Sequence, residues 1–154
     1  VFESCVFGNV QLNSSRHAQT AYLNCTFTRC ALFDASFEDC KLSGSTFART
    51  SLRPLRVTGG DWSFVGLHGA DLRGASFESV RMRESDLAGA NFADAVLRNV
   101  DLSGAQLRQS RFGKADLRGS DLSAFDPLTV DLKRAIIDPV QAVALAQALG
   151  LIVD

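Results

Sequence analysis

The chain repeats itself every five residues. The stretch "ADLRG" at 70–74 is followed by "ASFES" at 75–79, and the same rhythm returns as "ADLRG" at 115–119. Of the 27 positions from Phe2 to Leu132 whose numbers end in 2 or 7, 21 are Phe or Leu. A five-residue period excludes an amphipathic helix, because it would spread the apolar residues right around the helix, and it excludes a flat strand, whose faces alternate every two residues.

Two further columns keep the same phase. Positions ending in 0 or 5, from Cys5 to Val130, hold small residues or Val, with Leu55 and Phe125 as the exceptions. Positions ending in 4 or 9 are rich in Gly, Asn, Asp and Ser, which tolerate tight corners. We infer that the large and the small column both point inward, and that the third column marks the corners.

One geometry satisfies these columns. Each five-residue unit is a short extended side ending in a corner, and four sides close a coil of 20 residues. Stacked in parallel at a strand spacing of ~4.8 Å, neighbouring coils satisfy each other's backbone groups. The sequence therefore predicts an all-β parallel β-helix of about seven coils over residues 1–137. Residues 20 apart should lie over one another, and one such inner ladder contains Phe7, Phe27, Phe47, Leu67, Leu87 and Leu107.

The rhythm stops at Asp138, and residues 138–154 form a separate C-terminal segment. Asp138 suits a helix N-cap, Pro139 the first helical position and Gly150 the C-terminal stop. This helix is apolar nearly all round and must be covered on more than one side. In one interpretation it only plugs the open end of the β-helix. In the other, which we favour, its remaining face joins a second copy in a two-fold dimer through Val140, Val143, Ala144, Leu145, Leu149, Leu151 and Ile152.

The composition excludes several classes of function. The chain has 16 basic and 17 acidic residues among 154, so its net charge of −1 does not suit a nucleic-acid-binding protein. It has no apolar run long enough for a bilayer and no secretion signal, which predicts a cytoplasmic protein without membrane contact. Hydrolase, P-loop, zinc-protease and dinucleotide motifs do not occur. We therefore expect no enzymatic activity, no cofactor and no metal.

A few side chains are candidates for a special role. The cysteines occupy the small inward column, where buried free thiols are favoured over a metal site or a disulfide between Cys5 and Cys25, which lie one coil apart. His17 replaces a Phe or Leu, and a distorted or hydrogen-bonded core position is favoured over a catalytic one. These residues are Cys5, Cys25, Cys30, Cys40 and His17.

The stretch "RPLRVTGGDWSF" at 53–64 disturbs the pattern, since Leu55 replaces a small residue. It indicates either a bulged or bent coil, or a contact surface that kinks the rod. Leu23, Phe33 and Phe64 fall in outward columns, where they either contact a partner or cover a neighbouring residue.

The columns resemble the repeat A-[D/N]-L/F-x-x of the pentapeptide-repeat proteins, and its Asp or Asn position is well obeyed from Asp61 onward. The stretches "YLNCTFTRC" at 22–30, "SLRPLRV" at 51–57, "HGADLRGASFESVRMRESDL" at 68–87 and "DPVQAVALAQALGL" at 138–151 are similar to the mycobacterial fluoroquinolone-resistance members of that family. The resemblance implies a right-handed quadrilateral β-helix with further coils before Val1 and a homodimer joined by the C-terminal helix. It also implies binding to DNA gyrase through imitation of DNA in shape and charge.

A protein that imitates DNA should be acidic, yet the outward charges of the four sides sum to −2, +1, +2 and −1. The acidic surface then lies either in coils before Val1 or around the dimer junction, and within this sequence we expect the contact with gyrase at Asp101, Asp121, Asp126 and Asp131. The near-neutral sides favour an alternative, in which the chain is a structural or protein-interaction scaffold with a different partner.

Overall fold

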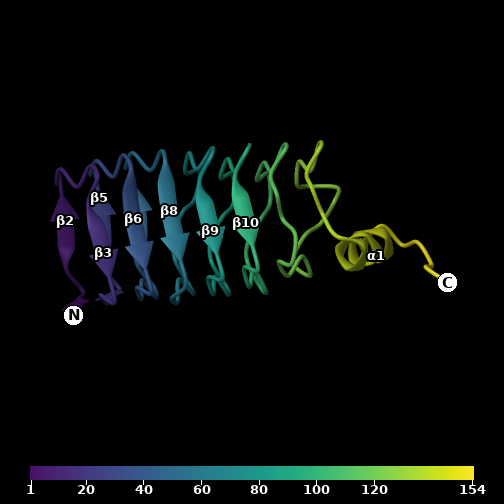
Figure 1. Cartoon of the computed structure of the whole chain (residues 1–154), viewed down its shortest axis with the longest axis horizontal. Helices are drawn as coiled ribbons and strands as arrows, with labels where there is room; N and C mark the ends of the chain where they lie inside the picture. The colour runs from purple at the N-terminus through teal and green to yellow at the C-terminus, as the bar shows by residue number, and fades with distance from the viewer.

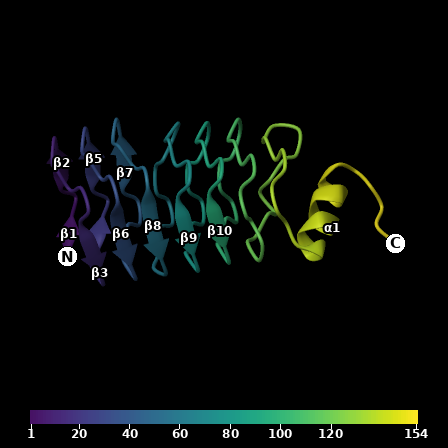
Figure 2. The same cartoon turned by 45° about the horizontal axis from the view of Figure 1, so that its top comes forward.

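The computed structural model describes all residues from Val1 to Asp154. Figure 1 shows a rod whose coils follow one another from the N-terminus to the C-terminus, with the two termini at opposite ends. A single helix, α1 (Pro139–Ala148), closes the C-terminal end, and Figure 2 shows it lying against the last coil. The chain contains no helix with the length and apolar character needed to cross a membrane.

Each side of the coil has room for only a very short strand, because a corner interrupts the backbone every five residues. The strands form three parallel sheets, one for each of three sides: β1-β4, β2-β5-β7 and β3-β6-β8-β9-β10. Their bounds are β1 (Phe2–Glu3), β2 (Val6–Gly8), β3 (Arg16–Ala18), β4 (Tyr22–Leu23), β5 (Thr26–Thr28), β6 (Ala35–Glu38), β7 (Thr46–Ala48), β8 (Leu55–Thr58), β9 (Ser76–Glu78) and β10 (Val96–Arg98).

Every strand pairing joins residues 20 apart. Phe27, for example, pairs with Phe7 on one side and with Phe47 on the other. The predicted parallel β-solenoid is therefore confirmed. Regular strands mark five levels in the largest sheet, fewer than the seven or so coils that we predict from the repeat. Isolated bridges continue that ladder from Val96 to Asp116 and Ile136, so the stacking extends beyond the regular strands.

The corners adopt one backbone conformation throughout the rod. Every position ending in 4 or 9 from Ser4 to Arg134 has a positive φ, except Pro54, which follows a cis peptide bond, and Ala124 and Thr129. For residues other than glycine this conformation costs about 1–2 kcal/mol. Hydrogen bonds between coils, such as the 3.0 Å bond from Arg29 N to Ala48 O, hold it in place. The stacking of coils therefore overrides the local preference of the residue.

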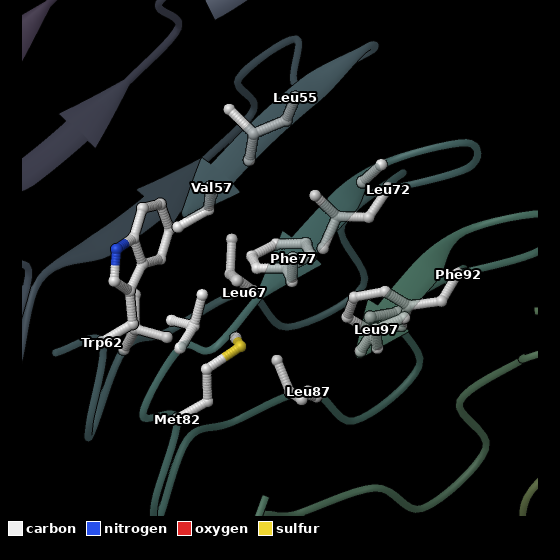
Figure 3. Close-up of a cluster of buried hydrophobic side chains, with 14 of the residues drawn as sticks. Leu55, Val57, Trp62, Leu67, Leu72, Phe77, Met82, Leu87, Phe92 and Leu97 are labelled. Atoms are coloured by element: carbon white, nitrogen blue, oxygen red, sulfur yellow. The ribbon is translucent and has the colours of Figure 1, made fainter. Parts of the chain in front are cut away.

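The interior is filled by ladders of large side chains. The rings of Phe7, Phe27 and Phe47 stack nearly parallel, with centroids 4.9 and 4.8 Å apart. Leu67, Leu87 and Leu107 continue this column and are buried. Figure 3 shows the middle of the core, where side chains from successive coils meet at the centre of the rod; the labelled residues include Trp62, Phe77 and Phe92.

The stretch 53–64 does not interrupt the solenoid. Leu55 pairs in register with Ala35 and is fully buried, so no residue is inserted into the coil. The structure therefore has no bulge here, and Ala35 leaves the space that the larger Leu55 fills.

The corner at Pro54 is distorted, as the alternative of a bent coil expects: the Arg53–Pro54 peptide is cis, and Asp34 N donates to Pro54 O at 3.0 Å instead of to the carbonyl of the residue before it. The glycine at position 60 is required, because it has a φ of +87° and a Cβ there would overlap the carbonyl oxygen of Cys40.

Helix α1 is tied to the last coil by its first turn. Asp138 is the N-cap, and its Oδ1 accepts from Gln141 N at 2.9 Å, while Gln141 Oε1 accepts from Asp138 N at 2.9 Å. The buried Nε2 of Gln141 donates to Leu117 O at 2.6 Å and to Ser120 O at 2.8 Å. Leu145 packs against the core. The predicted helix and its cap are confirmed, and one face of the helix plugs the rod.

Candidate protein-interaction surface

The inward polar side chains are used for structure. Cys25, Cys30 and Cys40 are buried free thiols whose Sγ atoms donate to backbone carbonyls, and Cys5 is a half-buried free thiol. No group of three His, Cys, Asp or Glu side chains is arranged to hold a metal ion. A binding site is therefore expected on the outer surface of the rod.

His17 lies in a hydrogen-bonded chain at the N-terminal end of the core. Its Nε2 is 2.8 Å from Ser15 Oγ, its Nδ1 is 2.7 Å from Tyr22 OH, and its ring stacks on Phe37 at 4.4 Å. Ser15 Oγ donates to Leu12 O at 2.6 Å, so the tautomer with a proton on Nε2 satisfies every member. Burial lowers the pKa of His17. His17 is therefore a hydrogen-bonded core position, which is the interpretation that the sequence favours.

Many outward carboxylates are held by arginines. Asp71 Oδ2 lies 2.8 Å from Arg73 and 3.5 Å from Arg53. The hydrogen bond from the Arg73 side chain is the main reason why the pKa of Asp71 falls to about 2. These arginines reduce the negative potential that the carboxylate presents to a partner.

Asp116 is the most enclosed of these carboxylates. Its Oδ2 lies 2.9 Å from Arg118 Nη2 and 2.6 Å from Arg98 Nη2, and its side chain is only 12% exposed. The bonds from Arg118 and Arg98 hold the pKa of Asp116 far below its usual range. This cluster stabilises two adjacent coils and offers little charge to a ligand.

The four sides of the rod can be named by residue number. The first side comprises residues 1–4 and every twentieth residue after them, the second side 6–9, the third side 11–14 and the fourth side 16–19. Asp101 and Asp121 lie on the first side, Asp126 on the second and Asp131 on the third. The four carboxylates that we predict as a partner surface are thus distributed over three sides.

Only part of that set is free of positive neighbours. Asp101 Oδ2 is 3.1 Å from Arg83 Nε. Asp121 and Asp126 are exposed, make no ion pair, and accept from the backbone of their own turns, Ser123 N at 2.8 Å and Leu128 N at 2.9 Å. We call Asp121 and Asp126 the acidic edge. It lies in the coil nearest α1.

The outer face of α1 and the tail that follows are apolar and exposed. Val140 is 79% exposed and Ile152 is 94% exposed, and Val143, Ala144, Leu149 and Leu151 are exposed as well. Leu145 instead points inward, against the core. Val153, which follows Ile152 in the tail, is exposed as well. We call the exposed residues of this set the apolar end.

A shallow hollow that the sequence did not reveal runs along the third side. It has a volume of about 540 Å³, and small residues at 31 and 51 leave the space. Phe33 lines it and is 56% exposed, and Phe64 is exposed elsewhere on the rod, as their outward columns predict. Leu23 is half-buried. The residues that line the hollow are Asn13, Ala31, Phe33, Thr50, Ser51, Leu52, Arg53 and Asp71.

The chain is similar over part of its length to one curated protein. It is 42% identical over 55 residues to the pentapeptide repeat protein MfpA of Mycobacterium tuberculosis (strain ATCC 25618 / H37Rv). The match covers 36% of this chain and 30% of MfpA.

Two solved structures match over most of the chain. Full-length QnrB1, a plasmid-mediated fluoroquinolone resistance protein, matches with 17% identity and a TM-score of 0.44 over 97% of this chain and 99% of its own. HetL, a pentapeptide repeat protein involved in heterocyst differentiation regulation in the cyanobacterium Nostoc sp. strain PCC 7120, matches with 16% identity and a TM-score of 0.35 over 84% of this chain and 88% of its own. A family model described as a pentapeptide repeat region covers residues 30–107, just over half of the chain. The chain therefore belongs to the pentapeptide-repeat family.

Proposed function

We propose that the chain is a non-catalytic protein that binds DNA gyrase at its DNA-binding surface and changes the response of the enzyme to fluoroquinolones. The resemblance to the fluoroquinolone-resistance members of the family supports this proposal, as does the partial match to MfpA. Gyrase acts in the cytoplasm, so the proposal places this chain there as well. The proposal includes no direct binding to nucleic acid.

The observation that carries the proposal is the position of the acidic edge beside the apolar end. Asp121 and Asp126 carry uncompensated charge in the last coil, and Val140 and Ile152 are exposed on the adjoining helix and tail. A two-fold dimer through the apolar end brings two acidic edges together near the middle of a rod of double length. A surface that binds DNA must be basic, because DNA is a polyanion, and it attracts such an acidic centre.

The test is a supercoiling assay with purified gyrase, with and without a fluoroquinolone. We expect the wild-type chain to change supercoiling or drug-induced cleavage at micromolar concentration. Asp121→Asn together with Asp126→Asn should weaken this effect. The matched control is Asp39→Asn with Asp94→Asn, which removes two exposed carboxylates without ion pairs elsewhere on the rod and should leave the effect intact. An unchanged assay with the wild-type chain refutes the proposal.

The dimer requires its own measurement. Val140→Asp places a charge on the exposed face of α1 and leaves the neighbouring Gln141, which is buried and ties the helix to the rod, unchanged. In sedimentation equilibrium we expect the wild-type chain at twice the mass of the Val140→Asp variant. A wild-type monomer at all concentrations contradicts the dimer and leaves α1 as a plug only.

The paired carboxylates favour a second candidate function, a protein-interaction scaffold that does not use gyrase. Asp71, Asp101 and Asp116 are all neutralised by arginine, so most of the rod has no strong negative potential. A pull-down with the tagged chain distinguishes the two candidates. Recovery of gyrase supports the first, and recovery of other proteins without gyrase supports the scaffold.

A further inference from the structure

The third side of the rod carries four cations close to its C-terminal end. Arg111, Lys114, Lys133 and Arg134 are all exposed, and none of them makes an ion pair. On the same side, two levels further from α1, Arg73 is paired with Asp71 at 2.8 Å. On this side, the uncompensated positive charge is thus confined to the last two levels. We call these four residues the basic patch.

The cations of the basic patch lie in register on neighbouring coils. The bridge between Arg111 and Asp131 sets the register of this side, so Lys114 and Arg134, which are 20 residues apart, lie over one another at the same corner. Both have the left-handed conformation, with φ of 59° and 61°. At a coil spacing of ~4.8 Å the two charges repel, as like charges do across paired strands. An anion between them relieves this repulsion.

The patch also has room for such an anion. A hollow of about 330 Å³ is lined by Ala93, Gly113 and the side chains of Lys114, Lys133 and Arg134. A Cβ added at Gly113 would meet only Lys133 O, at 3.7 Å, so the small residue leaves the floor of the hollow open. A ligand carboxylate in this hollow therefore lies among three cationic residues.

Two carboxylates at the rim decide which class of anion fits. Asp94 and Asp131 also line the hollow, and Asp131 Oδ1 accepts from Lys133 N at 3.0 Å. A nucleic-acid backbone presents acceptors only and is repelled by these groups, and its affinity depends on a long series of phosphate contacts. A peptide brings N–H donors for the aspartates together with carboxylates for the cations. The mixed lining therefore favours a protein segment over a nucleic acid.

From this geometry we propose that the basic patch binds an acidic, extended segment of a partner protein. The first side lies opposite the third in a four-sided coil, and in the last coil it carries Asp121, which makes no ion pair. An acidic segment is repelled there, so it binds on one side of the rod only. This proposal is independent of gyrase binding, since the basic patch and the acidic edge occupy different sides.

The test uses fluorescence anisotropy with a labelled peptide of about ten residues, alternating Glu and Gly, which is long enough to span both coils when extended. We expect salt-dependent binding by the wild-type chain. Lys114→Glu with Arg134→Glu should lower the affinity at least about tenfold, because several weak exposed ion pairs are lost or reversed together.

The matched control is Arg29→Glu with Arg49→Glu. These arginines are also exposed, unpaired, one coil apart and left-handed, with φ of 52° and 51°, but they lie on the second side, away from the patch. This control should change the affinity less than about twofold, and circular dichroism should show that both variants fold. Absence of binding by the wild-type chain, or equal losses in the two variants, overturns the proposal. Tighter binding of a duplex DNA oligonucleotide than of the peptide at the same salt concentration also overturns it.

Discussion

Replacement of Phe92 by Ala tests whether the coil register fixes the core. The ring of Phe92 is fully buried, stacks on Phe112 with centroids 4.8 Å apart, and meets the edge of Phe77 at 6.2 Å. Truncation of a buried Phe typically costs about 3–5 kcal/mol, and the cost depends on how far the cavity collapses. Here the neighbours above and below are held by parallel backbone pairing, so little collapse is possible. We expect a loss in the free energy of unfolding of about 4–5 kcal/mol.

The assay is equilibrium unfolding in urea followed by circular dichroism. With a slope of about 2 kcal/mol per molar urea, the midpoint for Phe92→Ala should fall by roughly 2 M. Phe92→Leu keeps most of the volume and loses the ring stack, so it should cost about 1 kcal/mol. Phe33→Ala is the control, because it makes the same chemical change at a ring that is 56% exposed. It should cost less than about 0.5 kcal/mol. The reasoning fails if Phe92→Ala and Phe33→Ala differ by less than about 1 kcal/mol.

Three further perturbations test the cap, the ion pairs and the corners. Gln141→Ala removes the side-chain donor to two buried carbonyls and one half of the capping box, so it should lower the free energy of unfolding by about 2 kcal/mol. It should also speed amide exchange in α1, and unchanged exchange would contradict the view that Gln141 ties the helix to the rod. Because the folded pKa of Asp116 lies below its unfolded value, its contribution to stability is present above about pH 4 and disappears as the pH falls further. Asp116→Asn should flatten this acid loss in urea titrations, and an unaltered pH profile contradicts the assignment. Gly60→Ala should lower the free energy of unfolding by about 3 kcal/mol, because the new Cβ clashes with the backbone of Cys40. Gly74→Ala, whose Cβ enters open space at a similar φ, should lower it by only about 1 kcal/mol. Equal losses for the two glycines would show that the backbone moves aside.

Much of the fold follows from the spacing of residues alone. The inward columns, the corners at every fifth position and the helix that begins after Asp138 are all visible in the sequence, because each depends on local pattern. Of the two forms of disturbance expected at 53–64, the bulge is wrong, since Leu55 stays in register with Ala35, one coil away, and only the corner at Pro54 is distorted. The role of Gln141 could not be predicted from the sequence either, because its two carbonyl partners belong to the preceding coil.

The candidate surface was harder to predict than the core. Asp121, Asp126 and Asp131 are close in sequence, yet each step of five residues turns a corner, so they face three directions. Pairs within one side, such as Asp71 with Arg73, are visible in the sequence, but a pair between coils is hidden, since the bond from Arg98 to Asp116 joins residues 18 apart. The residue types at the corners give little information about the candidate surface, because the same left-handed backbone accepts Arg49, Phe64 and Glu84 as well as glycine.

The register of 20 residues restricts how such a chain changes its length. An insertion of one complete coil lengthens the rod and leaves every downstream ladder intact. An insertion of five residues also preserves the alternation of large and small inward side chains, but it rotates everything downstream by about a quarter turn relative to what precedes it. Asp121 and the apolar face of α1 would then point in a new direction with the core unharmed. Evolution or design can therefore change the direction in which the binding surfaces face in quarter-turn steps, without changing the core.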